Sequence, residues 1–405
     1  MTNEVTQKTT SDEQNVSSSN GLEPSLRFRE FKENLPQIKL SKLFHKCTQK
    51  NKDGTITNVI CNSAKNGLIP QRDFFDKDIA NTENTAGYYI IKNNDFVYNP
   101  RKSNEAPYGP VSIYKYAEDG IVSPLYLCFR AINSLCADYF EMYFKSSAWH
   151  RYIYLMGDSG ARHDRVSIKD EVFFDMPVRM PSLPEQEKIA AFLSLVDARI
   201  EKQRQLVEAL KKYKRGLLSA IFDRKIRFKD NDGNNFPDWG LKTVADVLNY
   251  EQPQKYIVFS ENYNDEYKTP VLTANKAFIL GYTNEETGVY SKGETIIYDD
   301  FTMDFKFVDF RFKVKSSTIK MLTCKNFNDL YFMYNLLLSL NLMPQSHQRS
   351  YISILEPTKI FVPCYDEQLI ISKVLRKVDS YFDQHNKYLD TLEKCKKGLL
   401  QQMFI

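Results

Sequence analysis

The sequence predicts a mixed α/β (α+β) fold in which two similar globular domains are separated by two long helices. The first supporting observation is an ungapped internal alignment of residues 181–222 with residues 363–404, in which 14 of the 42 aligned positions are identical. The second is that aromatic and β-branched segments before each of these stretches recur in the same order. A repeat of this length is too long for one solenoid unit, so the chain contains two copies of a whole module.

Composition limits the class of protein. The 405 residues can form two or three domains, and 42% hydrophobic with 26% charged residues is typical of a soluble globular protein. The formal net charge of +4 is too small for a polybasic nucleic-acid coat. The sequence has neither an apolar run of membrane length nor a signal-peptide pattern, which predicts a cytoplasmic protein with no membrane partner. The seven cysteines form no C-x-x-C pair and the five histidines are scattered, so we expect free thiols and no metal site.

Residues 1–22 are polar, and this composition predicts a disordered tail. Globular domains are expected at residues 23–180 and 226–362, each followed by a long helix at residues 181–225 and 363–405. Alternating and periodic apolar patterns predict the elements inside the globular domains. Short strands are expected at residues 86–98, 111–116, 288–298 and 307–314, and helices at residues 134–147 and 326–342.

Both long helices carry the signature of a paired seam. The first begins with a capping-box pattern from Ser182 to Glu185, with Pro184 in its first turn. Apolar residues then recur at alternating spacings of four and three, and eight of ten seam positions are apolar in each copy. A sustained repeat of 3.5 residues predicts an antiparallel coiled coil with pseudo-two-fold symmetry. The alternative is two separate amphipathic helices, each packed on its own domain.

Polar residues interrupt the two seams at matching places. In an antiparallel pair, Gln203 and His385 meet near the middle, and a polar pair at one layer fixes the register of the helices at some cost in stability. Lys214 and Lys396 form the other matched interruption. We interpret these lysines as side chains whose stems lie along the seam while their ammonium groups reach water. Matched interruptions favour pairing of the helices with each other.

Several stretches together resemble the specificity subunit of type I restriction-modification enzymes. The helix start P-x-x-x-E-Q and the later K-x-G-L-L each occur twice, at the same distance within both long helices. Three stretches of the first half resemble a recurrent form of the family's first target recognition domain. The matching stretches are residues 66–71, 94–100, 120–130, 181–203, 210–222, 226–239 and 366–404.

The resemblance implies a DNA-binding role without chemistry. Each target recognition domain of such a subunit recognises one half of a bipartite sequence in double-stranded DNA, and the paired helices set the gap. The resemblance also implies two methyltransferase (modification) subunits, which use S-adenosylmethionine to methylate adenine. Two restriction (helicase-nuclease) subunits, which use ATP and Mg²⁺, complete such a complex. No cofactor is then expected in this chain.

The sequence contains none of the catalytic or nucleotide-binding motifs that are expected of an enzyme acting on DNA. It contains no G-x-x-x-x-G-K-[ST] phosphate loop and no G-x-G-x-x-G nucleotide loop. Asn99-Pro100 is followed by Arg101-Lys102, whereas adenine methyltransferases place a proline and an aromatic residue there against the flipped base. These features argue against a stand-alone DNA methyltransferase with a fused recognition domain. A second alternative, a coiled-coil adaptor or structural protein, does not explain the loop of polar and basic residues before each helix.

Candidate DNA-binding residues lie in two loops of each domain. Arginine can bind guanine through two hydrogen bonds, and serine or backbone amides can hold phosphate. In the first domain the candidates are Tyr98, Asn99, Arg101, Lys102, Ser159, Gly160, Arg162, His163 and Arg165. The counterparts in the second domain are Lys276, Ser346, His347, Gln348 and Arg349. Glutamine can pair with adenine, and an aspartate of the segment Tyr298-Asp299-Asp300 can accept from cytosine. The alternative for every loop is a solvated turn.

Overall fold

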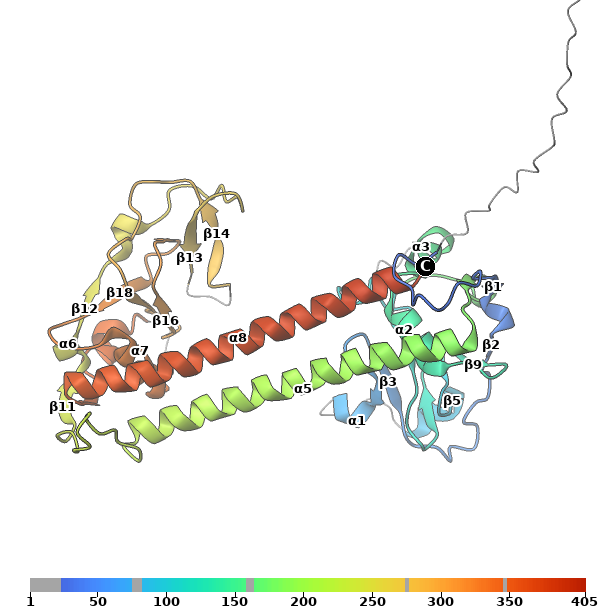
Figure 1. Ribbon diagram of the computed structural model, residues 1–405, viewed down its shortest axis with the longest axis horizontal. Coiled ribbons are helices and arrows are strands. Elements are labelled where there is room, and N and C mark those ends of the chain that lie inside the picture. The colour runs from blue at the N-terminus through green and yellow to red at the C-terminus, as the bar shows by residue number, and fades with distance from the viewer. Residues whose placement is uncertain (1–22, 75–81, 158–163, 274–276, 345–347) are drawn as a thin grey trace, which may run out of the picture. The chain divides into compact units, whose positions relative to one another are not determined.

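The computed structural model describes residues 23–74, 82–157, 164–273, 277–344 and 348–405 (Figure 1). The chain divides into two compact units. One contains the residues up to Lys202 together with Leu389–Ile405, and the other is Gln203–Tyr388. Each unit holds one globular domain and parts of two long helices. Within the part of the chain that the structure describes, no helix is both long enough and apolar enough to cross a membrane.

The first domain is built on the antiparallel four-stranded sheet β2-β9-β6-β7, which packs against the helix α2. Its strands are β1 (Gln37–Lys39), β2 (Phe44–Lys46), β3 (Ile60–Ser63), β4 (Gly67–Pro70), β5 (Tyr89–Ile91), β6 (Phe96–Tyr98), β7 (Val111–Ile113), β8 (Gly120–Val122), β9 (Leu127–Ala131) and β10 (Pro177–Arg179). Its helices are α1 (Gln71–Phe74), α2 (Ala137–Lys145), α3 (His150–Met156) and α4 (Asp170–Phe174), with 3-10 turns η1 (Leu40–Lys42) and η2 (Thr82–Gly87).

The second domain repeats this plan with the sheet β12-β18-β15-β16. Its strands are β11 (Gly240–Thr243), β12 (Leu248–Glu251), β13 (Thr269–Leu272), β14 (Ile279–Thr283), β15 (Thr295–Asp299), β16 (Phe305–Val308), β17 (Lys313–Val314), β18 (Ile319–Cys324) and β19 (Lys359–Val362). Its helices are α6 (Val244–Val247) and α7 (Leu330–Ser339), with the 3-10 turn η3 (Pro253–Tyr256) and the π-helix η4 (Tyr351–Leu355).

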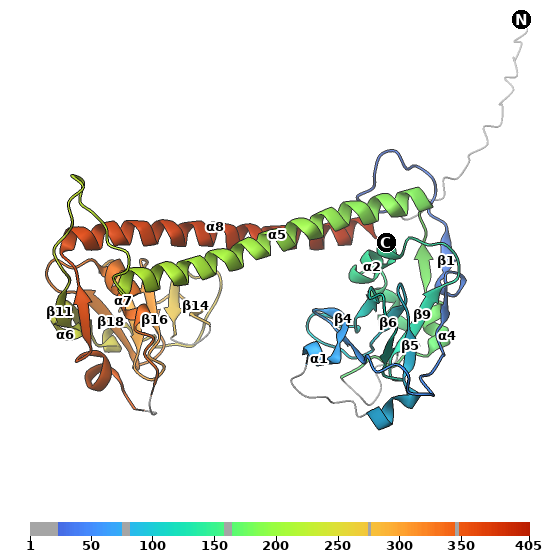
Figure 2. The same cartoon turned by 90° about the horizontal axis from the view of Figure 1, so that it is seen from below.

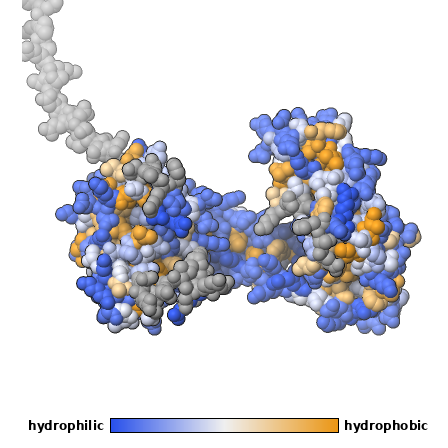
Figure 3. Space-filling view, turned by 180° about the vertical axis from the view of Figure 1, so that it is seen from behind, coloured by the Kyte–Doolittle hydropathy of each residue, from blue (hydrophilic) through white to orange (hydrophobic). Residues whose placement is uncertain are grey.

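The strand orders of the two domains confirm the internal duplication. The antiparallel pair β1–β10 of the first domain corresponds to β11–β19 of the second, and each pair ends just before a long helix. The short helices expected at residues 134–147 and 326–342 are found as α2 and α7. Phe140 on α2 and Phe332 on α7 are both fully buried. Figure 3 shows a mainly hydrophilic surface with scattered hydrophobic patches on both domains.

Two expected strands are interrupted in the structure. The strand expected at residues 86–98 is split into β5 and β6 by a turn at Asn94, whose φ is 68°. The carboxylate of Asp95 stabilises this turn by accepting from the amide of Lys92 at 2.7 Å. The strand expected at residues 307–314 is likewise divided between β16 and β17. Apolar content alone predicted continuous strands because it does not register these local turns.

The long helices α5 (Leu183–Phe222) and α8 (Tyr365–Met403) contain 40 and 39 residues. In each unit they lie side by side and antiparallel (Figures 1 and 2). The start of α5 packs into the first core through Leu193, while the end of α8 enters the same core through Met403, followed by Phe404. The second core takes the end of α5 through Ile221 and the start of α8 through Leu375. The predicted coiled-coil arrangement is therefore confirmed.

The repeated Glu-Gln pair anchors each helix start to its domain. Both carboxylate oxygens of Glu185 accept from the guanidinium of Arg27, at 2.7 and 2.8 Å. Arg227 binds Glu367 in the same way, at 2.8 and 3.0 Å. The prediction that Glu185 completes a capping box is therefore wrong, because Arg27 occupies its carboxylate.

The glutamine of each pair closes the first turn instead. The side-chain amide of Gln186 donates to the carbonyl of Pro181 at 2.9 Å, and Gln368 donates to Pro363 at 3.0 Å. Both glutamines are almost fully buried. Each residue of the repeated P-x-x-x-E-Q pattern thus has a structural role. In both copies the glutamine side chain donates to the carbonyl of the proline, and the glutamate binds an arginine from the start of the domain.

The polar interruptions of the seams are also paired. The side-chain nitrogen of Gln203 lies 3.0 Å from Nδ1 of His385 and donates to the carbonyl of His385 at 2.9 Å, so the expected meeting is found. The two lysines differ from the expectation that they reach water. Lys214 forms an ion pair with Asp379, and Lys396 forms the matching ion pair with Asp197. The repeated aspartates supply partners that the seam pattern alone did not reveal.

Phe404 should be a main source of stability for the first domain. Its ring is 5% exposed and lies 5.3 Å from that of Tyr139, so Phe404→Ala should cost about 3–5 kcal/mol. The chain has two tryptophans, and Trp149 lies in the first core. In a Trp239→Phe background, urea unfolding followed by Trp149 fluorescence measures the loss.

Tyr154→Ala is the control for this measurement, because its aromatic side chain lies in the same domain but is 70% exposed. It should change the free energy of unfolding by no more than about 0.5 kcal/mol. Equal effects of the two substitutions would contradict the placement of α8 in the first core.

Candidate nucleic-acid interface

The two candidate loops of the first domain form one surface. The amide of Lys102 donates to the carbonyl of Asp164 at 2.9 Å. Next to it, Arg101 and Arg165 pair through an isolated antiparallel bridge. The segment that follows β6 is therefore held against the segment that precedes α4. Three of the predicted cations, Arg101, Lys102 and Arg165, come together in this way.

Tyr98 does not belong to this surface. Its side chain is buried, its ring stacks on that of Phe173 at a centroid distance of 5.0 Å, and its hydroxyl donates to the carbonyl of Tyr108 at 2.9 Å. Burial raises the pKa of the Tyr98 hydroxyl. The structure corrects the prediction for this residue: as the last residue of β6, Tyr98 points into the core and positions the loop that follows.

Asn99 shapes the loop from a half-buried position. Its side-chain amide donates to the carbonyl of Asn62 at 3.1 Å, and its side-chain oxygen accepts from the amide of Arg101 at 3.1 Å. Gly109 lies against the same residue with a φ of +83°, and a Cβ atom there would come within 2.1 Å of the Asn99 carbonyl. Asn99 thus fixes the backbone from which the exposed side chain of Arg101 projects.

Arg165 carries a hydrogen-bond donor that is available to a ligand. Its Nε atom is buried and has no hydrogen-bond partner among the described residues, and its Nη2 lies at a long 3.5 Å from the carboxylate of Asp164. Slight desolvation raises the pKa of the Asp164 carboxyl, but the hydrogen bond and charge of Arg165 and the charge of Arg101 outweigh it, so that this pKa lies below its ordinary value. Positive potential therefore gathers at the loop.

Seven of the predicted contact residues lie outside the described residues. They are Ser159, Gly160, Arg162, His163, Lys276, Ser346 and His347. Each belongs to a segment that directly adjoins a described part of a candidate loop or hairpin.

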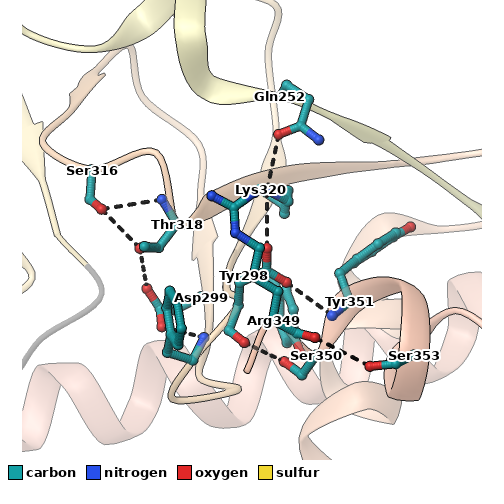
Figure 4. Close-up of polar contacts among 12 residues, drawn as sticks. Gln252, Tyr298, Asp299, Ser316, Thr318, Lys320, Arg349, Ser350, Tyr351 and Ser353 are labelled. Carbon is teal, nitrogen blue, oxygen red and sulfur yellow. Dashed lines mark hydrogen bonds and ion pairs between the residues drawn. The ribbon is translucent and has the colours of Figure 1, made fainter. Parts of the chain in front are cut away.

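In the second domain the acidic loop is buried (Figure 4). One carboxylate oxygen of Asp299 accepts from the amides of Phe301 and Thr302, and the other accepts from the hydroxyl of Thr318 at 2.8 Å. Asp300 pairs with Lys320 at 3.1 Å, and both side chains are nearly inaccessible. The expectation that an aspartate here accepts from cytosine is therefore wrong, because both carboxylates serve the fold.

The same backbone joint closes both interfaces. In the first domain the amide of Val166 donates to the carbonyl of Pro100 at 2.8 Å, and in the second the amide of Ser350 donates to the carbonyl of Asp300 at 3.0 Å. Pro100 lies two residues after Tyr98, the last residue of β6. Asp300 lies two residues after Tyr298, the next-to-last residue of the matching strand β15. The two joints are thus structurally equivalent.

This equivalence pairs Arg165 with Arg349. Each arginine directly precedes the residue that makes the joint, and each follows a predicted DNA-binding loop. Figure 4 shows Arg349 on the segment that also carries Ser350 and Ser353. The side chains of Arg349 and its neighbour Gln348 are exposed. Two domains therefore present one arginine each at the same place in the fold.

A pocket that the sequence did not predict adjoins the first of these surfaces. It has a volume of about 540 Å³ and extends from β3 to Arg101, Lys102 and Arg165. The buried residue Gln71 lines its wall. Gln71 is the last residue of the stretch 66–71, which resembles part of the first target recognition domain of type I specificity subunits. The local sequence pattern does not indicate that its side chain is functional.

Comparison with known proteins identifies the class. Residues 35–212 and 237–394 both match the family described as Type I restriction modification DNA specificity domain. These matches cover well over half of the chain, so the chain belongs to this family and contains its domain twice.

Two curated relatives are type I specificity subunits. The chain is 39% identical over 180 residues to the EcoR124I/EcoR124II specificity subunit of Escherichia coli. This alignment covers 38% of this chain and 44% of that protein. It is 28% identical over 196 residues to the MjaVIII specificity subunit of Methanocaldococcus jannaschii, with 45% and 46% covered. The alignments thus span less than half the length of these curated relatives.

Two solved structures share the fold over almost the whole chain. The type I restriction-modification S subunit from M. genitalium superposes with a TM-score of 0.57 at 15% identity, covering 95% of this chain and 99% of that one. A chain from a study of complex assembly and conformational transition in the type I R-M system gives a TM-score of 0.57 at 14% identity, covering 91% and 97%. Both support the duplicated architecture.

The close approach of Gly109 to Asn99 gives a stability prediction. Gly54→Ala, at a φ of +66° with open space around it, should cost about 1–2 kcal/mol from backbone strain alone. Gly109→Ala has similar strain and must also displace the Asn99 loop, which should add about 1–3 kcal/mol. Urea unfolding followed by Trp149 fluorescence compares the two variants within one domain. Equal losses would show that Gly109 does not support the loop.

Proposed function

We propose that this chain is the DNA specificity subunit of a type I restriction-modification complex. Each domain recognises one half of a bipartite target in double-stranded DNA. The observation that carries the proposal is the equivalence of Arg165 and Arg349, which lie beside the same backbone joint in two copies of one domain. Two similar surfaces on one chain suit two separated segments of one extended ligand.

Arginine supplies the chemistry that such recognition needs. A guanidinium can donate two hydrogen bonds to O6 and N7 of guanine in the major groove, and it can alternatively bind a phosphate. Lys102 and Arg101 add positive charge beside Arg165 for the DNA backbone. The small net charge of +4 implies few phosphate contacts, so strong binding requires further subunits.

The proposed partners perform the reactions. Two methyltransferase subunits bind the chain and methylate adenine with S-adenosylmethionine, and two restriction subunits with ATP and Mg²⁺ translocate and cleave DNA. This chain is non-catalytic in the proposed complex. Its support is the type I specificity subunits among its relatives and the duplicated architecture. Because the two domains share one strand order, we expect each to bind one copy of each partner.

The paired helices act as a separator in this proposal. A helix of 40 residues is about 60 Å long, and its two ends belong to different hydrophobic cores. The Gln203–His385 pair fixes the register between the helices. The length of the helices then sets the number of unspecified base pairs between the half-sites.

Substitution of the two equivalent arginines tests domain-specific recognition. If Arg165 contacts a guanine, Arg165→Ala should cost about 1–3 kcal/mol of binding free energy and relax one position of one half-site. Arg349→Ala should do the same in the other half-site only. Binding of the assembled methyltransferase complex to a library of half-site variants measures both effects. An arginine that contacts only phosphate would weaken all sites alike and lower the salt slope by about one unit.

The exposed arginines Arg29 and Arg311 provide matched controls for the two domains. Arg29→Ala and Arg311→Ala should leave the preference at every position unchanged. If Arg165→Ala and Arg349→Ala also leave all variants bound as by wild type, the two loops are surface turns and not DNA contacts.

Lengthening the helices tests the separator. Insertion of one heptad into residues 200–210 and another into residues 382–392 adds about 10 Å to each helix and preserves the seam. The gap in the methylated motif should grow by about 3 base pairs at 3.4 Å each, with both half-sites unchanged. Methylation mapping of DNA from cells that carry the variant measures the gap. An unchanged gap would remove the separator from the proposal.

A further inference from the structure

The pocket beside Arg165 contains an unused recognition group. Gln71 is 8% exposed and lines this pocket, and no hydrogen bond of its side-chain amide is found among the described residues. Its backbone is fixed, because its own amide donates to the carbonyl of Val59 at 2.8 Å. A carboxamide on a fixed backbone that opens into a pocket is therefore suited to a ligand.

Hydrogen bonds hold the part of the pocket lining that β3 contributes. Asn62 on β3 donates to the carbonyl of Val97 at 2.7 Å, and its side-chain oxygen accepts from the hydroxyl of Ser112 at 2.7 Å. Its carbonyl in turn holds the side chain of Asn99 at 3.1 Å. These bonds tie β3 to the central sheet and to the candidate loop. The pocket therefore keeps its shape without a ligand.

The remaining lining of the pocket suits a nucleotide. Arg101, Lys102 and Arg165 supply positive charge for a phosphate. Leu125, which is 67% exposed, and the aromatic ring of Tyr126 supply apolar surface for a base. A polar amide within a pocket bordered by cations and apolar side chains combines the contacts that one nucleotide of a DNA strand offers.

We propose that Gln71 is a specificity-determining residue that recognises an adenine in the half-site bound by the first domain. Its carboxamide oxygen accepts from adenine N6 and its nitrogen donates to adenine N7, while the neighbouring cations bind the adjoining phosphate. This inference rests on the proposed function, since it assigns one base of the same DNA target. It adds a contact that neither the candidate loops nor the matched arginines include.

Gln71→Ala in the complex assembled with the methyltransferase subunits tests the contact. Binding to a library of half-site variants should show a loss of about 5- to 150-fold for DNA with adenine at one position, where discrimination among bases also disappears. The half-site of the second domain should keep its preferences. Gln37→Ala, which changes an exposed glutamine of the same domain, should have no effect on any position. Unchanged binding by Gln71→Ala, or an even loss across all variants, would overturn the inference.

An atomic substitution in the DNA tests the same bond without altering the protein. Replacement of that adenine by 7-deazaadenine removes N7, and it should weaken binding by the wild-type complex but cause no further loss with Gln71→Ala. Equal losses with both proteins would show that Gln71 does not contact this base.

The proposed function and the Gln71 contact can fail separately. If the wild-type complex shows no preference at any position of the half-sites, the proposed function fails and the inference fails with it. If the wild-type complex selects a bipartite target while Gln71→Ala selects it equally well, only the inference fails. Trp149 fluorescence during urea unfolding confirms that the variant is folded in either case.

Discussion

Each long helix is part of two hydrophobic cores, and this shared packing is the constraint on which the rest of the structure depends. Phe222 near the end of α5 lies 5.6 Å from Phe332 of the second domain, while Phe404, just after α8, lies 5.3 Å from Tyr139 of the first. Neither domain can complete its core from its own globular segment. Because burial of large aromatic side chains dominates core energetics, the helices are as much a part of each domain as its sheet is.

The anchored helices in turn position the candidate interface. In the first domain, strand β10, which leads into α5, follows directly after α4 and the loop that carries Arg165. The arginine–glutamate pair at the start of each helix ties the beginning of the domain to the same place. The chain therefore enters and leaves each domain at fixed points. The loop that carries Arg349 lies between those points and outside the framework that holds the helices.

The framework was predictable from the sequence, whereas most of the site was not. The repeat, the helix lengths and the meeting of Gln203 with His385 follow from periodicity, which reflects burial directly. Tyr98 and Asp299 were misassigned because sequence position alone does not tell whether a polar side chain at a strand end turns inward. Lys214 was taken for a solvated residue because its partner Asp379 lies 165 positions away in the chain and becomes a neighbour only through the antiparallel pairing. Gln71 gave no signal, because the pocket that it lines exists only in the folded chain.

The central claim is that one chain specifies two separated DNA segments through two copies of one domain. The most direct measurement is the methylation pattern that the assembled methyltransferase complex leaves on genomic DNA that lacks prior modification, mapped at single-base resolution. The account predicts a single motif with two specified segments and an unspecified gap of constant length, with a methylated adenine in each segment. A contiguous motif, a gap of variable length, or methylation without any sequence preference would contradict it.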